Sequence, residues 1–294
     1  MKHEQRFHAP IDGVIFKLGI NENCPKIHCS ILGPSNKQVG SLIIKKNVLS
    51  QLEFKNIVMA VLREKPMFRI QVGSKMGLRG WNSIKGILKY SEFQFTVDFS
   101  AHKNFDRIRL SDSGLREFMY GVDKSTSLRV LNIKDNNITS IGCEILKNYL
   151  PRTKINNLNI SGNPIGNDGI FMISKLLVLP KYEMLELDIS SCNFDQIGAK
   201  SIYTCLLKNC QLEVLHMNRN KLRGPTIRYF TEAMWKNKNL KKLSLESCEL
   251  DHEASVRVLE ALENNFYLKA VNLSHNGFTE KLSDSISQLF SSEN

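Results

Sequence analysis

The sequence predicts an α/β solenoid, in which short parallel strands form a curved sheet on the inside of a stack of coils and helices lie outside. Three observations predict it. A five-position apolar pattern recurs six times at nearly constant spacing. Each copy opens with the alternation typical of a short strand. Each copy then continues into a stretch whose apolar residues recur at helical spacing.

The recurring pattern is L-x-x-L-x-L-x-x-N/C-x-L, with other apolar residues replacing some leucines. Its first copy uses Leu128, Leu131, Ile133, Asn136 and Ile138. Successive first positions are 27, 29, 28, 28 and 28 residues apart. Chance does not keep five positions in register over six copies, so we expect one structural repeat. The first positions of the six copies are Leu128, Ile155, Met184, Leu212, Leu240 and Leu268.

A small polar or thiol side chain occupies the turn that follows each strand. Backbone groups in a stacked turn have no hydrogen-bond ladder of their own, so they need other partners. We therefore expect each of these side chains to point into the coil and to bond backbone groups of the neighbouring coil. The six turn residues are Asn136, Asn163, Cys192, Asn220, Cys248 and Asn276.

The helical stretches are predicted at residues 141–150, 169–178, 197–207, 226–235, 254–262 and 282–290. Asp195 and Asp251 stand where a helix N-cap belongs. A single coil leaves apolar faces uncovered, so the coils are expected to be stable only when neighbours stack.

The repeat length of 28 or 29 residues, and the alternation of Cys192, Asn220, Cys248 and Asn276, resemble the ribonuclease-inhibitor-like subfamily of leucine-rich-repeat proteins. The resemblance covers residues from about 105 to 290. It implies a leucine-rich-repeat solenoid with a curved parallel sheet inside and helices outside. It also implies a scaffold that binds another protein along the concave sheet.

One member of that family gives an enzyme-related alternative, the Ran-type GTPase-activating protein. The resemblance would then require an arginine on a loop near the first coils and an acidic tail. Arg79 is the best-placed arginine, but residues 291–294 read Ser-Ser-Glu-Asn and the chain is basic. The sequence therefore favours a non-enzymatic protein-binding scaffold.

Residues 1–104 do not follow the repeat. Strands are predicted at residues 14–20, 26–32, 39–44, 68–72 and along the alternation 93–99, and helices at 49–64 and 81–88. This segment is either a small α+β unit that precedes the solenoid or a degenerate start of the solenoid, and the separate unit is favoured. The predicted domains are residues 1–104 and 105–294. A shortened repeat at the junction would use Phe105, Ile108, Leu110, Ser113 and Leu115.

The basic charge is concentrated in the N-terminal unit. Residues 1–100 carry 15 Lys or Arg and 7 Asp or Glu, a net charge of +8, while residues 101–294 carry 25 and 22, a net charge of +3. Such a surface is either simply solvated or attracts an acidic protein, a membrane surface or nucleic acid. Nucleic acid is disfavoured because neither a base-stacking motif nor an arginine-rich run is present.

The sequence contains none of the glycine-rich phosphate-binding motifs or the nucleophile-elbow motif, so no catalytic residue, cofactor or metal is predicted. No apolar run reaches the ~18 residues that a membrane span requires. Seven cysteines, two of them assigned to turns, favour a reducing compartment over a disulfide framework. We therefore expect a cytoplasmic monomer, with cytoskeletal or ciliary settings as further options.

The predicted binding face consists of residues that point outward from the strands of the concave sheet. With strands ~4.8 Å apart, the central row would extend roughly 24 Å from the first strand to the last. Asp188, His216 and Glu246, near its middle, are expected to have no role in packing. The face contains one arginine and no aromatic residue, although such side chains usually anchor tight interfaces. Either the concave face therefore binds a polar partner, or a protein partner is recruited through the basic N-terminal unit and the solenoid is a spacer. The predicted members of the concave face are Asn132, Asn159, Glu186, Asp188, His216, Asn218, Arg219, Ser244, Glu246 and Asn272.

Overall fold

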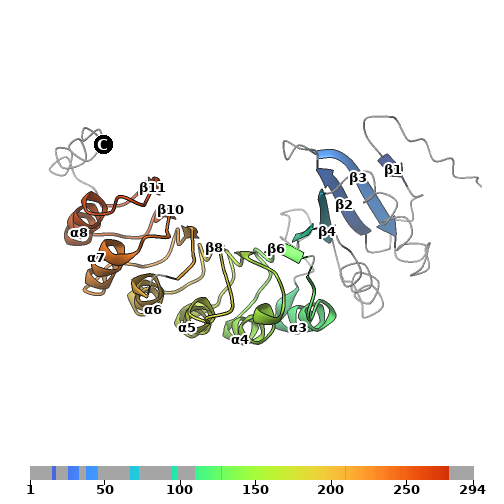
Figure 1. Cartoon of the computed structure of the whole chain (residues 1–294), viewed down its shortest axis with the longest axis horizontal. Coiled ribbons are helices and arrows are strands. Elements are labelled where there is room, and N and C mark those ends of the chain that lie inside the picture. Colours follow the sequence, from blue (N-terminus) through green and yellow to red (C-terminus); the bar gives the residue numbers. More distant parts are fainter. Residues whose placement is uncertain are drawn as a thin grey trace, which may run out of the picture. The chain divides into compact units, whose positions relative to one another are not determined.

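A computed structural model of the chain confirms the predicted leucine-rich-repeat solenoid (Figure 1). It describes residues 15–17, 26–32, 38–45, 67–72, 94–98, 110–126, 128–208 and 210–277. The chain divides into two compact units. The first comprises Met1–Asn136 with Arg152–Ile155, and the second comprises Asn137–Pro151 with Asn156–Asn294.

The second unit consists of regular coils. Its strands run parallel and in sequence order, and its helices form a row along one side of them (Figure 1). The strands are β7 (Asn157–Asn159), β8 (Glu186–Asp188), β9 (Val214–His216), β10 (Lys242–Ser244) and β11 (Ala270–Asn272). The helices are α4 (Ser140–Tyr149), α5 (Gly166–Leu177), α6 (Gln196–Leu207), α7 (Ile227–Lys236) and α8 (His252–Glu263), with a short 3-10 helix η1 (Leu150–Arg152) after α4.

The helix predictions are confirmed at 141–150, 197–207, 226–235 and 254–262, within one or two residues at each end. The predicted N-caps are also confirmed, because the carboxylate of Asp195 accepts the N–H of Ile197 and that of Asp251 accepts the N–H of Ala254. Helix α5 begins at Gly166 rather than residue 169. Its first turn carries no apolar residue, so the apolar periodicity could not reveal it.

The core of the second unit lies between the strands and the helices. The inward leucine of each central strand is buried, as are the apolar faces of the helices that cover it. The rings of Tyr203 on α6 and Phe230 on α7 meet edge to face at 5.4 Å between centroids, which packs neighbouring coils together.

The described residues of the first unit form six strands in the spatial order β1-β3-β2-β4-β5-β6. Strand β2 pairs antiparallel with β3 and β4, whereas β4, β5 and β6 are parallel. The predicted strands are therefore confirmed. Their bounds are β1 (Ile15–Lys17), β2 (Lys26–Leu32), β3 (Gln38–Lys45), β4 (Met67–Val72), β5 (Gln94–Asp98) and β6 (Leu128–Asn132), and α3 (Ser111–Gly121) separates the last two.

The prediction of a shortened repeat ending at Ser113 and Leu115 is wrong. Both residues lie in α3, whose buried Leu115, Phe118 and Met119 follow the spacing of a helical face. The strand of this extra coil is instead β5, which pairs parallel with β6. Repeat geometry thus reaches back at least to residue 94. The domain boundary at residue 104 stays a prediction, while Phe105, Ile108, Arg79 and the predicted helices at 49–64, 81–88 and 282–290 lie outside the described residues.

Buried asparagine side chains join one coil to the next, as the sequence predicted. Asn220 is 2% exposed, and its Oδ1 accepts the N–H of Cys192 in the preceding coil at 3.0 Å. Its Nδ2 donates to the carbonyl oxygen of Ile189 in that coil at 3.0 Å and to that of Met217 in its own coil at 2.9 Å. One amide therefore satisfies backbone groups of two coils that water cannot reach.

The same bonding recurs along the stack. Asn163 accepts the N–H of Ile138 at 2.9 Å, and Asn276 accepts the N–H of Cys248 at 2.8 Å. In the first unit, Asn136 accepts the N–H of Leu110 at 2.9 Å. The extra coil is thus joined to the first regular repeat by the same kind of hydrogen bond to a buried asparagine.

The cysteine turns use a weaker form of this contact. The Sγ of Cys192 donates to the carbonyl oxygen of Ile160, and that of Cys248 to the carbonyl oxygen of Met217, each at 3.3 Å. Burial raises the pKa of the Cys248 thiol to about 11, so the thiol keeps its proton at neutral pH and can donate it. Because a thiol is a weak donor and a weak acceptor, it secures the turn less firmly than an amide.

A second pair of asparagines joins the coils at the opposite edge, where each helix ends. Asn237 Nδ2 donates to the carbonyl oxygen of Leu206 at 2.8 Å, and Asn265 Nδ2 to that of Met234 at 2.6 Å. These acceptors belong to the last turn of the preceding helix, where carbonyl groups have no partner within the helix. The sequence analysis missed this pair, although the two residues stand 28 positions apart and each lies three residues before the start of a repeat.

We predict that Asn220→Ala lowers the free energy of unfolding by about 1–3 kcal/mol, because it leaves buried backbone groups of two coils without partners. Cys248→Ala should cost less, because only a weak thiol contact is lost. Urea denaturation of the parent and both variants measures the two costs. The reverse ranking would contradict this account of the turn.

We also predict a loss of stability at alkaline pH that depends on Cys248. The thiol titrates near 9.0 in the unfolded chain and near 11 in the fold. Its favourable contribution is therefore complete below pH 9 and is lost as the pH rises to 11, a change of about 2 kcal/mol. Urea denaturation of the parent and Cys248→Ala across this range should show their difference shrinking with pH. A constant difference would contradict the prediction.

Candidate functional site

The predicted central row of the concave sheet forms a continuous row in the second unit. Asp188 pairs with Asn159 on one side and with His216 on the other, and Ser244 pairs with His216 and with Asn272. Asn132 occupies the equivalent place in β6 of the first unit. The parallel register therefore places equivalent residues of successive repeats beside one another.

Several members of this row have a structural role that the sequence analysis did not assign. The Oδ1 of Asp188 accepts the N–H of Ser190 at 3.0 Å. Asn132, Asn159 and Asn272 accept the N–H two residues later in the same way. The sequence analysis expected no role in packing for Asp188 and did not include this bond, through which its short side chain closes the turn at the end of β8.

Asn218, in the turn after β9, closes the turn after β10 from the neighbouring coil. Its Oδ1 accepts the Oγ–H of Ser244 at 2.7 Å and the N–H of Glu246 at 2.8 Å. Ser244 is consequently 6% exposed, so it does not lie at the surface as the sequence predicted. His216 and Asp188, in contrast, are half-buried and border the open face.

Two acidic members of the face bond neighbouring amides. Glu186 accepts from Asn157 Nδ2 at 2.8 Å, and Glu246 accepts from Asn272 Nδ2 at 3.2 Å. The first bond joins the adjacent strands β7 and β8, and the second joins the turn after β10 to β11, so that the direction of both carboxylates is fixed. The bond from Asn272 to Glu246 was likewise not predicted from the sequence.

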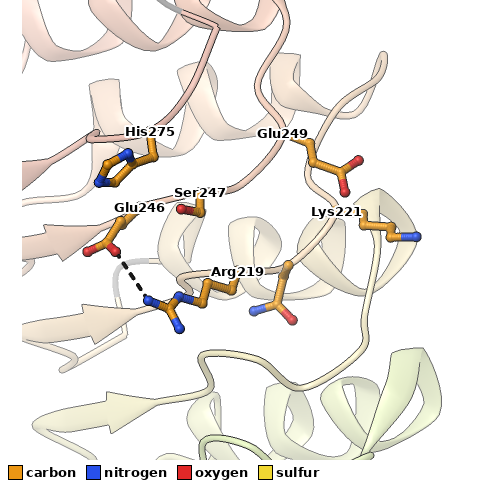
Figure 2. A pocket seen from close by; sticks show the side chains of 7 residues that line it. Arg219, Lys221, Glu246, Ser247, Glu249 and His275 are labelled. Carbon is orange, nitrogen blue, oxygen red and sulfur yellow. Dashed lines mark ion pairs between the residues drawn. The ribbon is translucent and has the colours of Figure 1, made fainter.

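A polar hollow of about 450 Å³ lies where the last described turns follow β9, β10 and β11 (Figure 2). It brings together Arg219 and Glu246, which were predicted to lie on the binding face, and His275. The complete lining is Arg219, Asn220, Lys221, Glu246, Ser247, Glu249 and His275.

The ion pair in this hollow is loose. The guanidinium of Arg219 lies 3.7 Å from the carboxylate of Glu246, and their side chains are 68% and 28% exposed (Figure 2). An exposed pair at that distance contributes little to stability, about 0–1 kcal/mol. Arg219 can therefore turn to another carboxylate without a large loss to the fold.

The direction of these side chains follows from the turn geometry. Arg219, Ser247 and His275 occupy the same place in successive turns, and each has a left-handed backbone with φ of 57°, 55° and 58°. The same conformation recurs at Asp135 and Ser191, so it belongs to the repeat and not to one site. Sequence analysis missed Lys221, Ser247 and Glu249, although the repeat register would have placed them beside Arg219 and His275.

The hollow presents opposite charges side by side, Arg219 and Lys221 with Glu246 and Glu249. It can therefore recognise a partner surface that itself carries both charges. Among the residues that the structure describes, no three His, Cys, Asp or Glu side chains gather in a way that could hold a metal ion. In the same described part, no helix has the length and apolar character needed to cross a bilayer.

The chain is similar to proteins that contain leucine-rich repeats. A profile for Leucine Rich repeat matches residues 124–146 and 153–174, and a second profile of that description matches residues 267–289. Mouse "NACHT, LRR and PYD domains-containing protein 14" is 29% identical over 176 residues, which cover 59% of this chain and 18% of that protein. Pig "Ribonuclease inhibitor" is 25% identical over 170 residues, which cover 57% of this chain and 37% of that protein.

The chain thus spans less than two fifths of the length of either relative. Among solved structures, "Leiomodin-1 Actin-Binding Site 2" aligns at a TM-score of 0.30 with 14% identity, over 52% of this chain and 69% of that one. A TM-score of 0.30 is too low to support a conclusion about this chain.

The matched profiles fall on the coils themselves, at β6 and α4, at β7 and α5, and at β11. The relatives, the repeat length and the alternating Asn and Cys turns all indicate leucine-rich repeats of one type. The described coils are leucine-rich repeats, and the chain is similar to ribonuclease-inhibitor-like leucine-rich-repeat proteins.

Proposed function

We propose that this chain is a non-enzymatic scaffold whose concave sheet binds a protein partner, with the hollow beside Arg219 as the anchor of the interface. Leucine-rich-repeat proteins are generally protein-interaction modules, and a stack of coils provides an extended concave surface for that purpose. A cytoplasmic setting accompanies the proposal, since the five described cysteines are buried and form no disulfide with one another.

The observation that carries the proposal is the state of Arg219. It is the single arginine of the predicted face, it is exposed, and its ion pair with Glu246 is loose. Arginine is among the side chains that most often carry binding energy at protein interfaces. Its planar group can form two parallel hydrogen bonds with a partner carboxylate, which the 3.7 Å contact with Glu246 does not achieve.

Neighbouring residues extend the proposed binding surface beyond Arg219. His216 and Asp188 continue it along the sheet on β9 and β8, and each is half-buried. Lys221 and His275 extend it along the turns. The resulting face is polar and carries both charges, so the partner it fits is a protein surface with alternating charge.

We predict that the variant Asp188→Asn, His216→Ala, Arg219→Ala loses about 2 kcal/mol or more of binding free energy for the partner. Asn at 188 keeps the acceptor for the Ser190 N–H, so the melting temperature should be nearly unchanged. Partners captured by the full chain are compared with those captured by the variant, by quantitative mass spectrometry followed by titration of each candidate.

The matched control is Glu253→Ala with Arg257→Ala, which removes an exposed Arg–Glu pair from helix α8 and should leave capture unchanged. A second variant reverses Lys45, Lys46, Lys85 and Lys89 to Glu and tests recruitment through the basic N-terminal segment. If that reversal abolishes capture while the concave variant binds like the parent, the solenoid is a spacer and the proposal is wrong.

A further inference from the structure

Exposed apolar side chains gather at the edge of the second unit where helices end and strands begin. Five of the ten large exposed apolar residues in the described part of the chain lie there. Three of the five, all aromatic, lie at the C-terminal end of α7 and in the loop after α8. Phe266 is 82% exposed, Trp235 57% and Tyr267 46%.

The asparagine pair described above holds these rings in place. Asn265, which bonds the end of α7, also accepts the N–H groups of Tyr267 and Leu268, each at 2.9 Å. The loop that carries Phe266 and Tyr267 is thereby fixed against the end of the helix that carries Trp235. The rings therefore project from a rigid edge and not from a freely moving segment.

The two segments that carry these rings are basic. Residues 235–242 and 264–270 contain five lysines and no Asp, Glu or Arg. Lys236 and Lys241 pair with carboxylates from elsewhere, Glu232 and Glu213. Lys238 places its Nζ 5.9 Å from the ring centroid of Tyr267, so cation and ring lie together. We call Trp235, Lys236, Lys238, Phe266, Tyr267 and Lys269 the aromatic–lysine edge.

We infer that the aromatic–lysine edge is a docking surface for an anionic lipid bilayer. Trp and Tyr rings favour the boundary between headgroups and acyl chains, and a protruding Phe gains by leaving water for that boundary. Lysines keep their charge at the headgroups while their stems lie along the apolar layer. An anionic membrane surface attracts each of these charges.

The composition of the aromatic–lysine edge favours a lipid bilayer over a protein or a single-stranded nucleic acid. Protein interfaces are enriched in arginine and depleted in lysine, which is the opposite of what these loops contain. Binding of single-stranded nucleic acid combines stacked rings with a charged groove that follows the backbone. Lys238 already lies over the ring of Tyr267 here, which reduces the area open to a base.

The test is co-sedimentation of the full chain with phosphatidylcholine vesicles, with and without phosphatidylserine. We expect binding to the anionic vesicles that falls as salt rises. Trp235→Ser with Phe266→Ser should lower the vesicle partition coefficient about tenfold, since both inserted rings are lost. Lys238→Glu with Lys269→Glu should lower it by a similar factor, because two attracted charges become repelled ones.

The matched control is Phe171→Ser with Ile197→Ser, which removes two exposed apolar side chains from the helices α5 and α6 without touching the edge. It should bind like the parent. The chain has two tryptophans, Trp81 and Trp235. With the substitution Trp81→Phe, the fluorescence of Trp235 should shift to shorter wavelength on anionic vesicles and remain unchanged on neutral ones.

Three results would overturn the inference. The first is no binding of the parent to anionic vesicles. The second is binding that both edge variants retain, which would place the contact elsewhere in the chain. The third is edge-dependent binding of a single-stranded oligonucleotide, or of an acidic peptide, in place of vesicles. The inference concerns a different surface from the concave face, so its failure would leave the proposed function standing.

Discussion

Each turn of this solenoid contains backbone groups that the turn itself cannot satisfy, and buried asparagine amides satisfy them. An amide suits the task because it has one acceptor and two donor sites, so a single side chain can bond both its own coil and the one before it. Asn220 does so, and Asn163 and Asn276 repeat the contact on either side. The stack is therefore joined by hydrogen bonds between residues about 28 positions apart in the chain.

The arrangement of the concave face follows from that constraint. Because the turns are locked in register, equivalent residues of neighbouring strands pair directly, as Asp188 does with His216. The same turns give Arg219 and His275 their left-handed backbone, which directs both side chains to the hollow in Figure 2. The proposed binding surface thus depends on buried contacts between the coils beneath it.

The sequence alone predicted what depends on periodicity. The strands, the helices, the N-caps at Asp195 and Asp251 and the inward asparagines all follow from spacing, since each repeat uses the same local geometry. It did not predict which surface residues bond one another. Asn218 accepts a hydrogen bond of 2.7 Å from Ser244 in the next repeat, and such a contact is visible only in the three-dimensional structure. The extra coil at β5 was missed because its pattern departs from the template, although its alternation was recognised as a strand.

The most direct test of this account is amide hydrogen exchange at the turn residues in the parent and in Asn220→Ala. The N–H of Cys192 is accepted by Asn220, and the N–H of Cys248 by Asn276. The account predicts that both amides exchange slowly in the parent. In the variant, the Cys192 amide should lose its protection first and most, while the Cys248 amide keeps more of its own. Unchanged protection of Cys192 in Asn220→Ala would contradict the claim that asparagine amides hold the coils together.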